Sequence, residues 1–483
     1  MYTPSLNEVR SMTGQGNLVP IYREIDGDLE TPVSAYLKIA KPPYSFLLES
    51  VEGGERVARY SFIGTEPTAV FKTGATEEGG SIDPLLPVEE ALSAMKAIPV
   101  PNLPRFTGGA VGYISYDAVQ HFEKLPSPES DPLGLPESVF MLATDLVVFD
   151  HFRNKIVVIS HAKMDHDVNA EYARATRRID EMIRRLDSNV TASRTTSSLD
   201  QPPTSVEVET NMSRKQFEDM VARVKKYIVA GDVIQTVVAH RFSRPTNAHP
   251  FQIYRALRNV NPSPYMYYLD LDDFHIVGAS PEMLVQIEDG IIQTHPIAGT
   301  APRGTDERDD LRIERELLED AKERAEHIML VDLGRNDVGR VSEPGTIVVN
   351  QLMEVERYSH LMHLVSNVTG KLDQRYTNYD AIRACFPAGT LSGAPKIRAM
   401  EIISELEPDK RGPYGGAVGY FDLRGNMDTA ITIRTLVVKD GTAYTQSGAG
   451  IVYDSVPAKE YEETLHKSAA VLKAIEQAEK ELG

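Results

Sequence analysis

The sequence predicts a protein of mixed α and β structure, and three observations support this. Short apolar runs bounded by turn residues, which are typical of strands, recur along the chain. Longer stretches carry apolar residues at helical spacing, as at 167–187 and from 457 onward. Three short glycine-rich strings near the carboxyl end predict loops that expose backbone N–H groups: FPAGTLSGAPK (386–396), YGGAVGYF (414–421) and QSGAGIV (446–452), with the isolated string ITIRT (431–435) among them.

The composition is typical of a globular protein large enough for two or three domains. Of 483 residues, 41% are hydrophobic and 25% are charged. The formal charge of −19 argues against non-specific binding to nucleic acid or to an anionic membrane. No apolar run approaches the roughly 20 residues of a membrane span, and the start MYTPSLNEVR lacks the basic start and apolar core of a signal peptide. We therefore expect a cytoplasmic protein that binds neither nucleic acid nor membrane.

The chain has one cysteine, Cys385. A single cysteine excludes an internal disulfide framework and any multi-cysteine metal site, which suits a reducing cytoplasm. Its setting, RACFPAGT, lacks the Gly-x-Cys-x-Gly pattern of an amidotransferase nucleophile. We interpret Cys385 as a buried structural thiol.

A segment rich in Ser, Thr and Pro divides the chain. The string SNVTASRTTSSLDQPPTS (188–205) can bury little surface, so it predicts a mobile linker within 188–212. This leaves an N-terminal part, 1–187, and a C-terminal part, 213–483. In the first part, strands are predicted at SFLLES (45–50), AVGYISY (110–116), DLVVFD (145–150) and KIVVIS (155–160), before the helix at 167–187.

The second part alternates helices and strands. Its predicted elements are, in order, a helix from Ser213 to Ala230 ended by Gly231, a strand at 233–242, a strand meander at 275–295, one helix at 314–334 and a final helix from about Pro457. The helix at 314–334 is amphipathic. Its apolar stripe is expected to contain Leu317, Ala321 and Ile328.

The glycine-rich strings and a neighbouring arginine indicate a site for a small anionic ligand. Backbone N–H groups in such loops can bind an anion, and Arg434 of ITIRT lies among them in sequence. Each glycine could instead serve only a tight turn or a close approach between strand and helix. The strings taken together with Arg434 favour the ligand site.

Two pairs of glutamates lie three residues apart on predicted helices, Glu323 with Glu326 and Glu460 with Glu463. Each pair places two carboxylates on one helix face, which in most proteins is simply solvated surface. If the two helices converge, the carboxylates provide the oxygen ligands of an octahedral Mg²⁺ site with room for water. Magnesium could then bind a substrate carboxylate that this acidic protein would otherwise repel.

Two residues are candidate proton carriers. Glu282, in ASPE after a predicted strand, can protonate a leaving hydroxyl if burial raises its pKa. His363, in YSHLMHLVS, is a candidate acid or base. The alternatives are that His363 packs in the core as an ordinary strand histidine, or that His360 takes the catalytic role.

Longer strings indicate a family resemblance. They are THPIAGTAPRG (294–304), DLGRNDVGRV (332–341), ACFPAGTLSGAPKIRAMEII (384–403), RGPYGGAVGYF (411–421) and QSGAGIVYDSVP (446–457). These strings closely resemble the chorismate-utilising enzymes and, within them, the large subunit, or component I, of the anthranilate synthases. The likeness runs from about Val19 to Ile475 and is broken chiefly in the linker. It implies an α+β fold with two large, mainly antiparallel sheets packed centrally and helices outside.

Two positions favour amination at C2 of chorismate over related reactions. In the isochorismate and salicylate synthases of this family, a lysine that activates water occupies the place of Gln235, and a neutral amide is a poor base. In the aminodeoxychorismate synthases, a lysine nucleophile occupies the place of Ala298 in PIAGT. The resemblance therefore implies that ammonia adds at C2.

The resemblance also implies roles for individual residues. Glu326 and Glu463 would bind Mg²⁺ most directly, with Glu323 and Glu460 completing the cluster directly or through water. Glu282 would face the C4 hydroxyl, and His363 would assist the second half of the reaction. The remaining residues would hold the substrate: Tyr414 and Arg434 the enolpyruvyl carboxylate, with Lys467 and the backbone of Gly448, Ala449 and Gly450, and Gly299, Thr300 and Thr390 the ring.

The implied reaction has two steps. Ammonia attacks C2 of chorismate as the C4 hydroxyl leaves, giving 2-amino-2-deoxyisochorismate, and elimination of pyruvate then gives anthranilate. The chain has no glutaminase nucleophile motif. The resemblance therefore implies a separate glutamine amidotransferase subunit, component II, that supplies ammonia within a hetero-oligomer.

Two segments resemble the tryptophan feedback site of this family, LLES (47–50) and NPSPYM (261–266). LLES alone could be an ordinary edge strand, but the two strings together favour regulation by L-tryptophan. The expected contacts are Leu48, Glu49, Ser50, Asn261, Pro262, Tyr265 and Met266. One further departure is His240, which replaces the Gln or Arg expected after Gln235 and either contacts the ring or simply packs.

Other functions are less consistent with the sequence. Ala298 and Gln235 disfavour an aminodeoxychorismate synthase of the 4-aminobenzoate branch and a variant that stops before pyruvate loss. A nucleotide-binding protein would carry a Gly-x₄-Gly-Lys-Ser/Thr or Gly-x-Gly-x-x-Gly fingerprint, which this chain lacks. A catalytically idle tryptophan-sensing subunit is disfavoured by the intact set of Glu282, Glu326, His363, Arg434 and Glu463.

Overall fold

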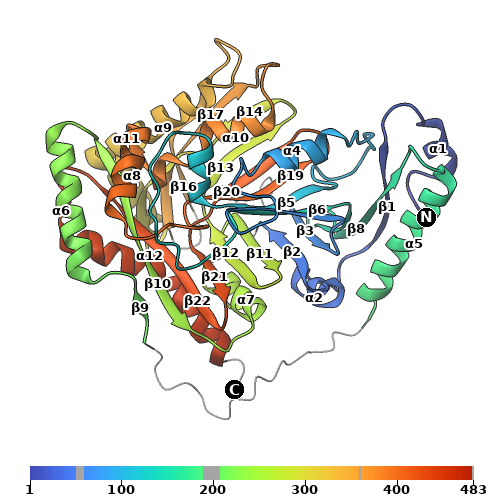
Figure 1. The fold of residues 1–483 in the computed structure, drawn as a ribbon, viewed down its shortest axis with the longest axis horizontal. Helices are drawn as coiled ribbons and strands as arrows, with labels where there is room; N and C mark the ends of the chain where they lie inside the picture. Colours follow the sequence, from blue (N-terminus) through green and yellow to red (C-terminus); the bar gives the residue numbers. More distant parts are fainter. Residues whose placement is uncertain (51–58, 189–206, 358–360, 481–483) are drawn as a thin grey trace.

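Two large β-sheets lie at the centre of the protein, and helices lie outside them (Figure 1). The structure is a computed structural model that describes residues 1–50, 59–188, 207–357 and 361–480. One sheet has twelve strands and the other ten, and the strands pair antiparallel throughout. Side chains from both sheets meet in one apolar layer, where the ring centroids of Tyr113 and Phe274 are 6.0 Å apart. The predicted α+β fold with two central antiparallel sheets is confirmed.

The twelve-stranded sheet combines strands from both parts of the chain. Its order is β1 (Leu18–Asp26), β8 (Lys155–Lys163), β7 (Asp145–Asp150), β3 (Tyr60–Thr65), β2 (Tyr44–Glu49), β11 (Tyr265–Leu271), β12 (Phe274–Ser280), β21 (Thr435–Lys439), β22 (Thr442–Ile451), β10 (Gln235–Pro245) and β18 (Gly393–Ala394), with β9 (Glu209–Thr210) beside β10. The two parts meet where β2 pairs with β11. This junction brings LLES next to NPSPYM.

The ten-stranded sheet is also shared. Its order is β15 (Ile297–Pro302), β17 (Leu361–Lys371), β14 (Ile291–Thr294), β13 (Met283–Glu288), β20 (Met427–Ile431), β19 (Ala417–Asp422), β5 (Gly109–Ile114), β6 (Ser138–Ala143) and β4 (Ala69–Thr73), with β16 (Val348–Arg357) beside β17. Here the two parts meet where β5 pairs with β19. The division at 188–212 stays a prediction about the order of the chain, and residues 189–206 of it lie outside the described residues.

The helices pack their buried faces against these sheets. The apolar side of the helix at 168–186, for example, shares one core cluster with the strands at 18–26 and 155–163. The helices are α1 (Leu6–Ser11), α2 (Pro32–Ile39), α4 (Leu86–Ser93), α5 (Val168–Leu186), α6 (Arg214–Ala230), α7 (Pro250–Val260), α8 (Glu307–Glu319), α9 (Ala321–Gly339), α10 (Asn378–Cys385), α11 (Lys396–Leu406) and α12 (Pro457–Lys480), with 3₁₀ turns η1 (Tyr116–His121) and η2 (Gly389–Leu391).

Local sequence signals determine both ends of α6. The side chain of Ser213 accepts a hydrogen bond from the backbone N–H of Gln216, and the Gln216 side chain accepts one from the backbone of Ser213. Gly231 ends the helix with φ 84°, a conformation that costs glycine little. The predicted helix is confirmed, including both of its ends.

The predicted strand meander at 275–295 is wrong at its first turn. β12 pairs with β11 and β21 in the twelve-stranded sheet, whereas β13 and β14 pair with each other in the ten-stranded sheet. The chain crosses from one sheet to the other at Pro281 and Glu282. Proline has no N–H for a sheet ladder, so pairing cannot simply continue through this turn. Glu282 is thereby placed at the junction of the two sheets.

The predicted helix at 314–334 is two helices. Asp320 has extended backbone (ψ 112°), and its side chain accepts hydrogen bonds from the N–H groups of Lys322 and Glu323, which begins α9. The break ends the predicted apolar stripe, because Leu317 is buried whereas Ala321 and Ile328 are exposed. α9 instead buries His327, Leu330, Val331 and Val338.

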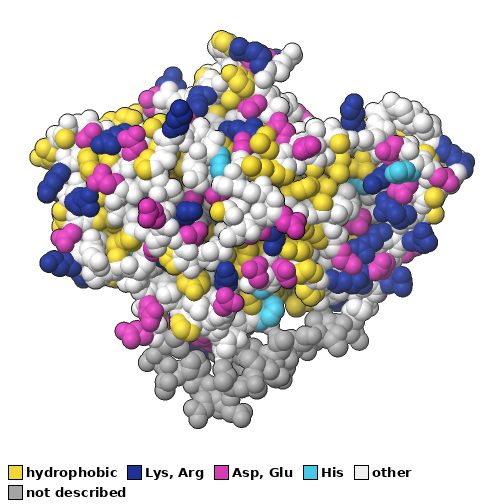
Figure 2. Space-filling model, viewed as in Figure 1, with side chains coloured by type: hydrophobic (Ala, Val, Ile, Leu, Met, Phe, Trp, Pro, Cys, Tyr) yellow, Lys and Arg dark blue, Asp and Glu magenta, His cyan; other side chains and the backbone are white. Residues whose placement is uncertain are grey.

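Lys and Arg side chains gather at the lower right of the face in Figure 2, where α5 lies in Figure 1. Several are paired with acids: Arg178 contacts Glu66 at 2.8 Å and Asp145 at 2.9 Å, and Arg185 contacts Glu66 at 2.9 Å. Much of the positive charge of α5 is therefore compensated locally. In the part of the chain that the structure describes, no helix combines the length and apolar character needed to cross a membrane.

Candidate active site

Glu282 lies where the chain passes between the two sheets. Its carboxylate accepts a hydrogen bond from Thr390 Oγ1 of η2 (3.1 Å), and its backbone carbonyl accepts one from the N–H of Ile431 (3.0 Å). Burial raises the pKa of Glu282 to about 8, although Thr390 and the charge of Lys467 both act to lower it. Glu282 is therefore a protonated carboxylic acid near neutral pH. Glu282, Thr390 and Ile431 also line a small cavity of about 40 Å³.

Arg434 is a half-buried cation between β20 and β21. Its backbone has φ 51°, and its guanidinium donates to the backbone carbonyl of Lys467. Among the described residues it forms no ion pair with a carboxylate. Burial lowers the pKa of Arg434, whereas Tyr414 and Glu463 act to raise it. A half-buried guanidinium without a carboxylate ion pair among the described residues is suited to an anionic ligand, because the ligand supplies the missing charge.

The glycines of β22 permit close contacts that a side chain would block. A Cβ at Gly448 would lie 2.8 Å from the carbonyl oxygen of Val238 and 3.0 Å from Tyr414 Oη, and a Cβ at Gly450 would lie 2.3 Å from Gln235 Nε2. Lys467 Nζ donates to the carbonyl of Gly448 (2.9 Å). Tyr414, Lys467, Gln235 and β22 therefore lie together.

Gln235 begins β10 and is 5% exposed. Its carbonyl oxygen Oε1 is buried and has no hydrogen-bond partner among the described residues. A buried amide oxygen of this kind is costly unless a ligand or water satisfies it. A ligand or a water molecule bound beside Gln235 would satisfy this oxygen.

His363 lies on β17 opposite the bulge of β15. Gly299 has φ +66° at this bulge, and Thr300 Oγ1 is 3.1 Å from His363 Nδ1. Burial lowers the pKa of His363, the backbone at Gly299 opposes this, and the charge of Arg434 lowers it further. His363 is accordingly a neutral imidazole, able to accept a proton. Its predicted competitor, His360, lies outside the described residues.

The two glutamate pairs lie on α9 and α12, and their charges act on one another. Burial raises the pKa of Glu323, and Glu326 and Glu463 raise it further. The pKa of Glu460 is raised by burial and by Glu463. Glu463 also pairs with Lys467 at 2.6 Å. The acidic faces of the two helices are therefore close enough for mutual repulsion.

This donor set fits a hard divalent cation. Carboxylate oxygens are the ligands that Mg²⁺ prefers, and a cation would relieve the repulsion between the pairs. Within the described residues, no three His, Cys, Asp or Glu side chains are grouped closely enough to hold a metal by themselves. The four glutamates are thus near one another but do not form a preformed ligand cluster.

The two segments expected to bind tryptophan are neighbours in the twelve-stranded sheet. Met266 lies opposite Glu49 and Tyr267 opposite Leu48, while Ser50 directly follows β2 and Asn261 and Pro262 follow α7. Glu49 is 5% exposed, accepts a hydrogen bond from Tyr254 Oη and lies 3.2 Å from Arg258 Nε. Tyr265 Oη donates to Asp428 on β20 (3.1 Å).

The sequence analysis missed the residues that hold these segments. Tyr254 and Arg258 lie on α7, one turn apart on the face toward Glu49, and nothing in the sequence marks that pairing. Asp428 is likewise a single acid in a strand, buried against Tyr265 and Gln286. Burial raises its pKa to about 6.

Two open questions about single residues are resolved. His240 packs rather than contacts the ring site: its Nε2 is 2.7 Å from Thr464 Oγ1, and the rings of Phe217, Phe242 and Tyr461 surround it. Burial lowers its pKa to about 4. Cys385 is buried, and burial raises its pKa, which makes it the unreactive thiol predicted.

The chain belongs to the chorismate binding enzymes, a family that matches residues 43–473. Within it, the chain is similar to large subunits of anthranilate synthases. It is 49% identical to anthranilate synthase component 1 of Acetivibrio thermocellus over 99% of both chains, and 49% identical to that of Pseudomonas aeruginosa over 96% of both. The crystal structure of anthranilate synthase component I from Streptococcus pneumoniae matches with a TM-score of 0.76 and 38% identity, over 93% of this chain and 99% of that one. The predicted resemblance to component I is confirmed.

Proposed function

We propose that this chain is the chorismate-aminating subunit of an anthranilate synthase, which converts chorismate and ammonia to anthranilate and pyruvate in tryptophan biosynthesis. One arrangement carries the proposal. A carboxylic acid that is protonated near neutral pH, Glu282, lies near Lys467, whose backbone carbonyl accepts a hydrogen bond from the half-buried guanidinium of Arg434. Among the described residues, that guanidinium has no carboxylate ion pair. The names of the relatives support the same reaction.

In the proposed complex, positively charged and hydrogen-bonding groups bind the two carboxylates of chorismate. Arg434, Tyr414 and Lys467, with the backbone of 448–450, would hold the enolpyruvyl carboxylate. Glu326 and Glu463, with Glu323 and Glu460, would hold Mg²⁺, which when bound supplies positive charge for the ring carboxylate. The chain's own residues then determine where the ring lies between Glu282 and His363.

In the first step ammonia adds at C2 and the C4 hydroxyl leaves. The electron pair of ammonia forms the C2–N bond, both conjugated ring double bonds shift by one position, and the C4–O bond breaks as Glu282 donates its proton to the departing oxygen, which leaves as water. The added nitrogen then loses one proton to give the amine. Gln235 is neutral and cannot activate water, and its unpartnered Oε1 is a hydrogen-bond acceptor suited to ammonia. Amination is therefore favoured over hydration.

In the second step pyruvate leaves and the ring becomes aromatic. His363, held neutral beside Thr300, accepts the proton from C2, the C2–H electrons form a ring double bond, and the C3–O bond breaks. The enolpyruvyl group takes up a proton to become pyruvate. Ala298 leaves no amine in PIAGT to form a covalent intermediate, which disfavours the 4-aminobenzoate reaction.

The proposed function includes two further partners, a protein subunit that supplies ammonia and L-tryptophan as an inhibitor. A component 1 implies another component, and a glutamine amidotransferase subunit is the proposed ammonia source. L-tryptophan would bind beside the junction of β2 and β11, where Glu49 and Met266 lie opposite each other. The strand β11 pairs with β12, whose last residue, Ser280, is two residues from Glu282, so the proposed effector site adjoins the catalytic acid.

The direct test is product identification. The purified chain is expected to form anthranilate, detected by its fluorescence, from chorismate, Mg²⁺ and a concentrated ammonium salt near pH 8. Aminodeoxychorismate or aminodeoxyisochorismate as the sole product would instead identify the alternative branch or the incomplete reaction. Absence of any product would indicate the idle tryptophan-sensing subunit.

The mutual repulsion of the glutamates predicts a stability effect for Glu323→Gln. The raised pKa of Glu323 means that ionising it costs folding free energy, a cost that appears as pH rises through that pKa, so at neutral pH the variant should melt at an equal or higher temperature without metal. Mg²⁺ at 100 times its Kd should stabilise the wild type by about 2.7 kcal/mol and the variant by less. Thermal unfolding with and without Mg²⁺ measures both effects. Glu78→Gln, an exposed acid in the turn after β4, is the matched control, and an undiminished Mg²⁺ effect in Glu323→Gln would contradict the metal assignment.

The proposed effector site predicts that Ser50→Phe relieves tryptophan inhibition. Ser50 follows Glu49 at the end of β2, and a bulky ring there overfills the space beside β11. Overpacking costs ~1–3 kcal/mol, so the inhibitory concentration of tryptophan should rise by ~10-fold. Initial rates over a tryptophan titration measure this, and kcat should stay near that of the wild type. Unchanged sensitivity, or equal relief by Ser93→Phe on the exposed end of α4, would refute the assignment.

A further inference from the structure

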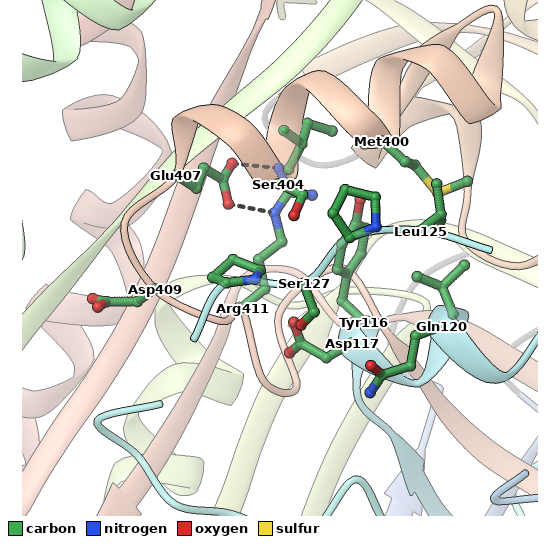
Figure 3. Close-up of a pocket in the computed structure, with 14 residues that line it drawn as sticks. Tyr116, Asp117, Gln120, Leu125, Ser127, Met400, Ser404, Glu407, Asp409 and Arg411 are labelled. Carbon is green, nitrogen blue, oxygen red and sulfur yellow. Dashed lines mark hydrogen bonds and ion pairs between the residues drawn. The ribbon is translucent and has the colours of Figure 1, made fainter. Parts of the chain in front are cut away.

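Arg411 is a fully buried arginine, 2% exposed, held by a glutamate at the end of α11. Its Nε donates to Glu407 Oε2 (2.8 Å) and its Nη2 to Glu407 Oε1 (2.6 Å), as the dashed lines in Figure 3 mark. Such a bidentate pair fixes the orientation of the guanidinium plane.

The rest of the guanidinium contacts the backbone beside the catalytic residues. Nη1 donates to the carbonyl of Leu391 (2.7 Å), the residue after Thr390. Nη2 donates to the carbonyl of Val237 (2.9 Å), two residues after Gln235 on β10. The same fork therefore holds the turn that presents Thr390 to Glu282 and the strand that presents Gln235.

Two tyrosines and a second backbone group complete the arrangement. The Arg411 guanidinium lies 4.4 Å from the ring centroid of Tyr116 and 5.7 Å from that of Tyr414. Glu407 Oε1 also accepts a hydrogen bond from the N–H of Ala239 (2.8 Å). Figure 3 shows Glu407, Arg411 and Tyr116 side by side below α11. Segments from four places in the chain thus meet at one ion pair.

The Arg411–Glu407 ion pair is better explained by the orientation that it imposes on the guanidinium than by a contribution to the free energy of unfolding. A buried ion pair pays a large desolvation cost, and well-packed apolar residues of similar volume are often as stable. What apolar residues cannot supply is a planar fork with donors aimed at three separate acceptors. Lysine cannot supply it either, because its ammonium is a point charge on a flexible stem.

We propose that Arg411, oriented by Glu407, is a positioning residue that holds the η2 turn and the start of β10, so that Thr390 contacts Glu282 and Gln235 faces the reacting ring. The inference rests on the proposed function for the identity of these site residues. Arg411 itself does not touch the substrate. Its loss should therefore act on kcat more than on the KM for chorismate, since Arg434 still binds the carboxylate.

The test compares Arg411→Lys with Arg244→Lys. Arg244 forms an equally buried pair with Glu479 (2.7 Å, both side chains 7% exposed) at the other end of β10. Both variants should lose melting temperature, but only Arg411→Lys should lose kcat, by ~10–100-fold, because misplacement by about 1 Å has effects of this size. Wild-type kcat in folded Arg411→Lys, or an equal loss in Arg244→Lys, would overturn the proposal.

If Arg411→Lys does not fold, the variant Glu407→Gln tests the same proposal. The amide keeps the shape and one acceptor, so the protein should fold while the fork loses its charged anchor, and kcat should fall with KM nearly unchanged. Unchanged kcat in this variant would also count against positioning.

A crystal structure of Glu407→Gln separates this inference from the proposed function. The η2 turn is expected to move and the Thr390–Glu282 hydrogen bond to be lost, whatever reaction the protein performs. A wild-type protein that aminates no chorismate would refute the proposed function alone. An unmoved turn with the hydrogen bond intact would refute the positioning role alone.

Discussion

Glu282→Gln is expected to lower kcat for anthranilate formation by ~10²–10⁴-fold while leaving the KM for chorismate within a few-fold. Glutamine keeps the size and polarity of the side chain but has no proton acidic enough to release to the departing C4 oxygen. The carboxylate-binding groups, Arg434, Tyr414 and Lys467, remain in place. Steady-state kinetics with saturating ammonia measure kcat and KM separately.

The pH dependence of the wild type gives a second readout for Glu282. Burial raises its pKa to about 8 from a usual value of 4.5, so the active, protonated form predominates below pH 8 and is lost above it. At constant free ammonia, kcat should fall on the alkaline side with a midpoint near 8. Glu282→Gln has no titrating group at this position, so its residual rate should lack that limb.

Glu137→Gln is the matched control for this prediction. Glu137 is also 9% exposed and contacts Gln120 and His121, away from the candidate site. Its replacement should lower stability without changing kcat. Wild-type kcat in Glu282→Gln, or the same alkaline limb in that variant, would exclude Glu282 as the acid.

Arg434→Met is expected to raise the KM for chorismate strongly while leaving the melting temperature unchanged or higher. A buried hydrogen-bonded charge in a binding site is worth about 2–5 kcal/mol, so kcat/KM should fall by ~10²–10³-fold. The free energy of unfolding should not fall, because Arg434 has no carboxylate ion pair among the described residues that the substitution would break. Partial burial of its charge is also already costly to the folded state. Methionine keeps most of the volume.

Arg241→Met supplies the contrast. Arg241 is buried and pairs with Asp409 at 2.7 Å, so its removal leaves a poorly exposed carboxylate without its partner. This variant should lose stability and keep its KM. Arg434→Lys should recover part of the lost affinity, because charge is restored without the fork. A normal KM in Arg434→Met would refute its role in anion binding.

Helix ends and strand positions could be predicted from the sequence because they depend on residues that are close together in the chain. Ser213 and Gly231 determine both ends of α6, and the apolar runs at 145–150 and 155–160 are the strands β7 and β8. The same runs do not say which strands pair. Residues 275–295 predict three strands correctly but not that they divide between two sheets.

The break at Asp320 shows why element boundaries were harder to predict. The apolar spacing from 314 to 334 fits one helix, but the side chain of Asp320 satisfies the first N–H groups of α9 better than continued helix would. The Asp320 side chain and the backbone carbonyls of a continued helix compete for the same N–H groups, and the outcome depends on only a few residues. Its consequence is the orientation of α9, which carries Glu323 and Glu326.

The residues of the candidate site likewise fall into those that the sequence predicts and those that only the structure reveals. Motif strings were sufficient to name Glu282, His363, Arg434 and the four glutamates, because such chemistry needs specific side chains and these recur as strings. Arg411, Tyr254 and Asp428 were not singled out, since their importance lies in contacts with residues more than a hundred positions away.

By itself, the amino-acid sequence determined which chemical groups are available, the helices and strands that carry them, and the family to which the chain belongs. Only the tertiary structure decided that Glu282 lies at the crossing of two sheets, that LLES lies beside NPSPYM, and that the acidic faces of α9 and α12 repel each other. The physical reason is that burial, pKa and pairing depend on distances through space. Those distances arise when the whole chain packs, and no short segment contains them.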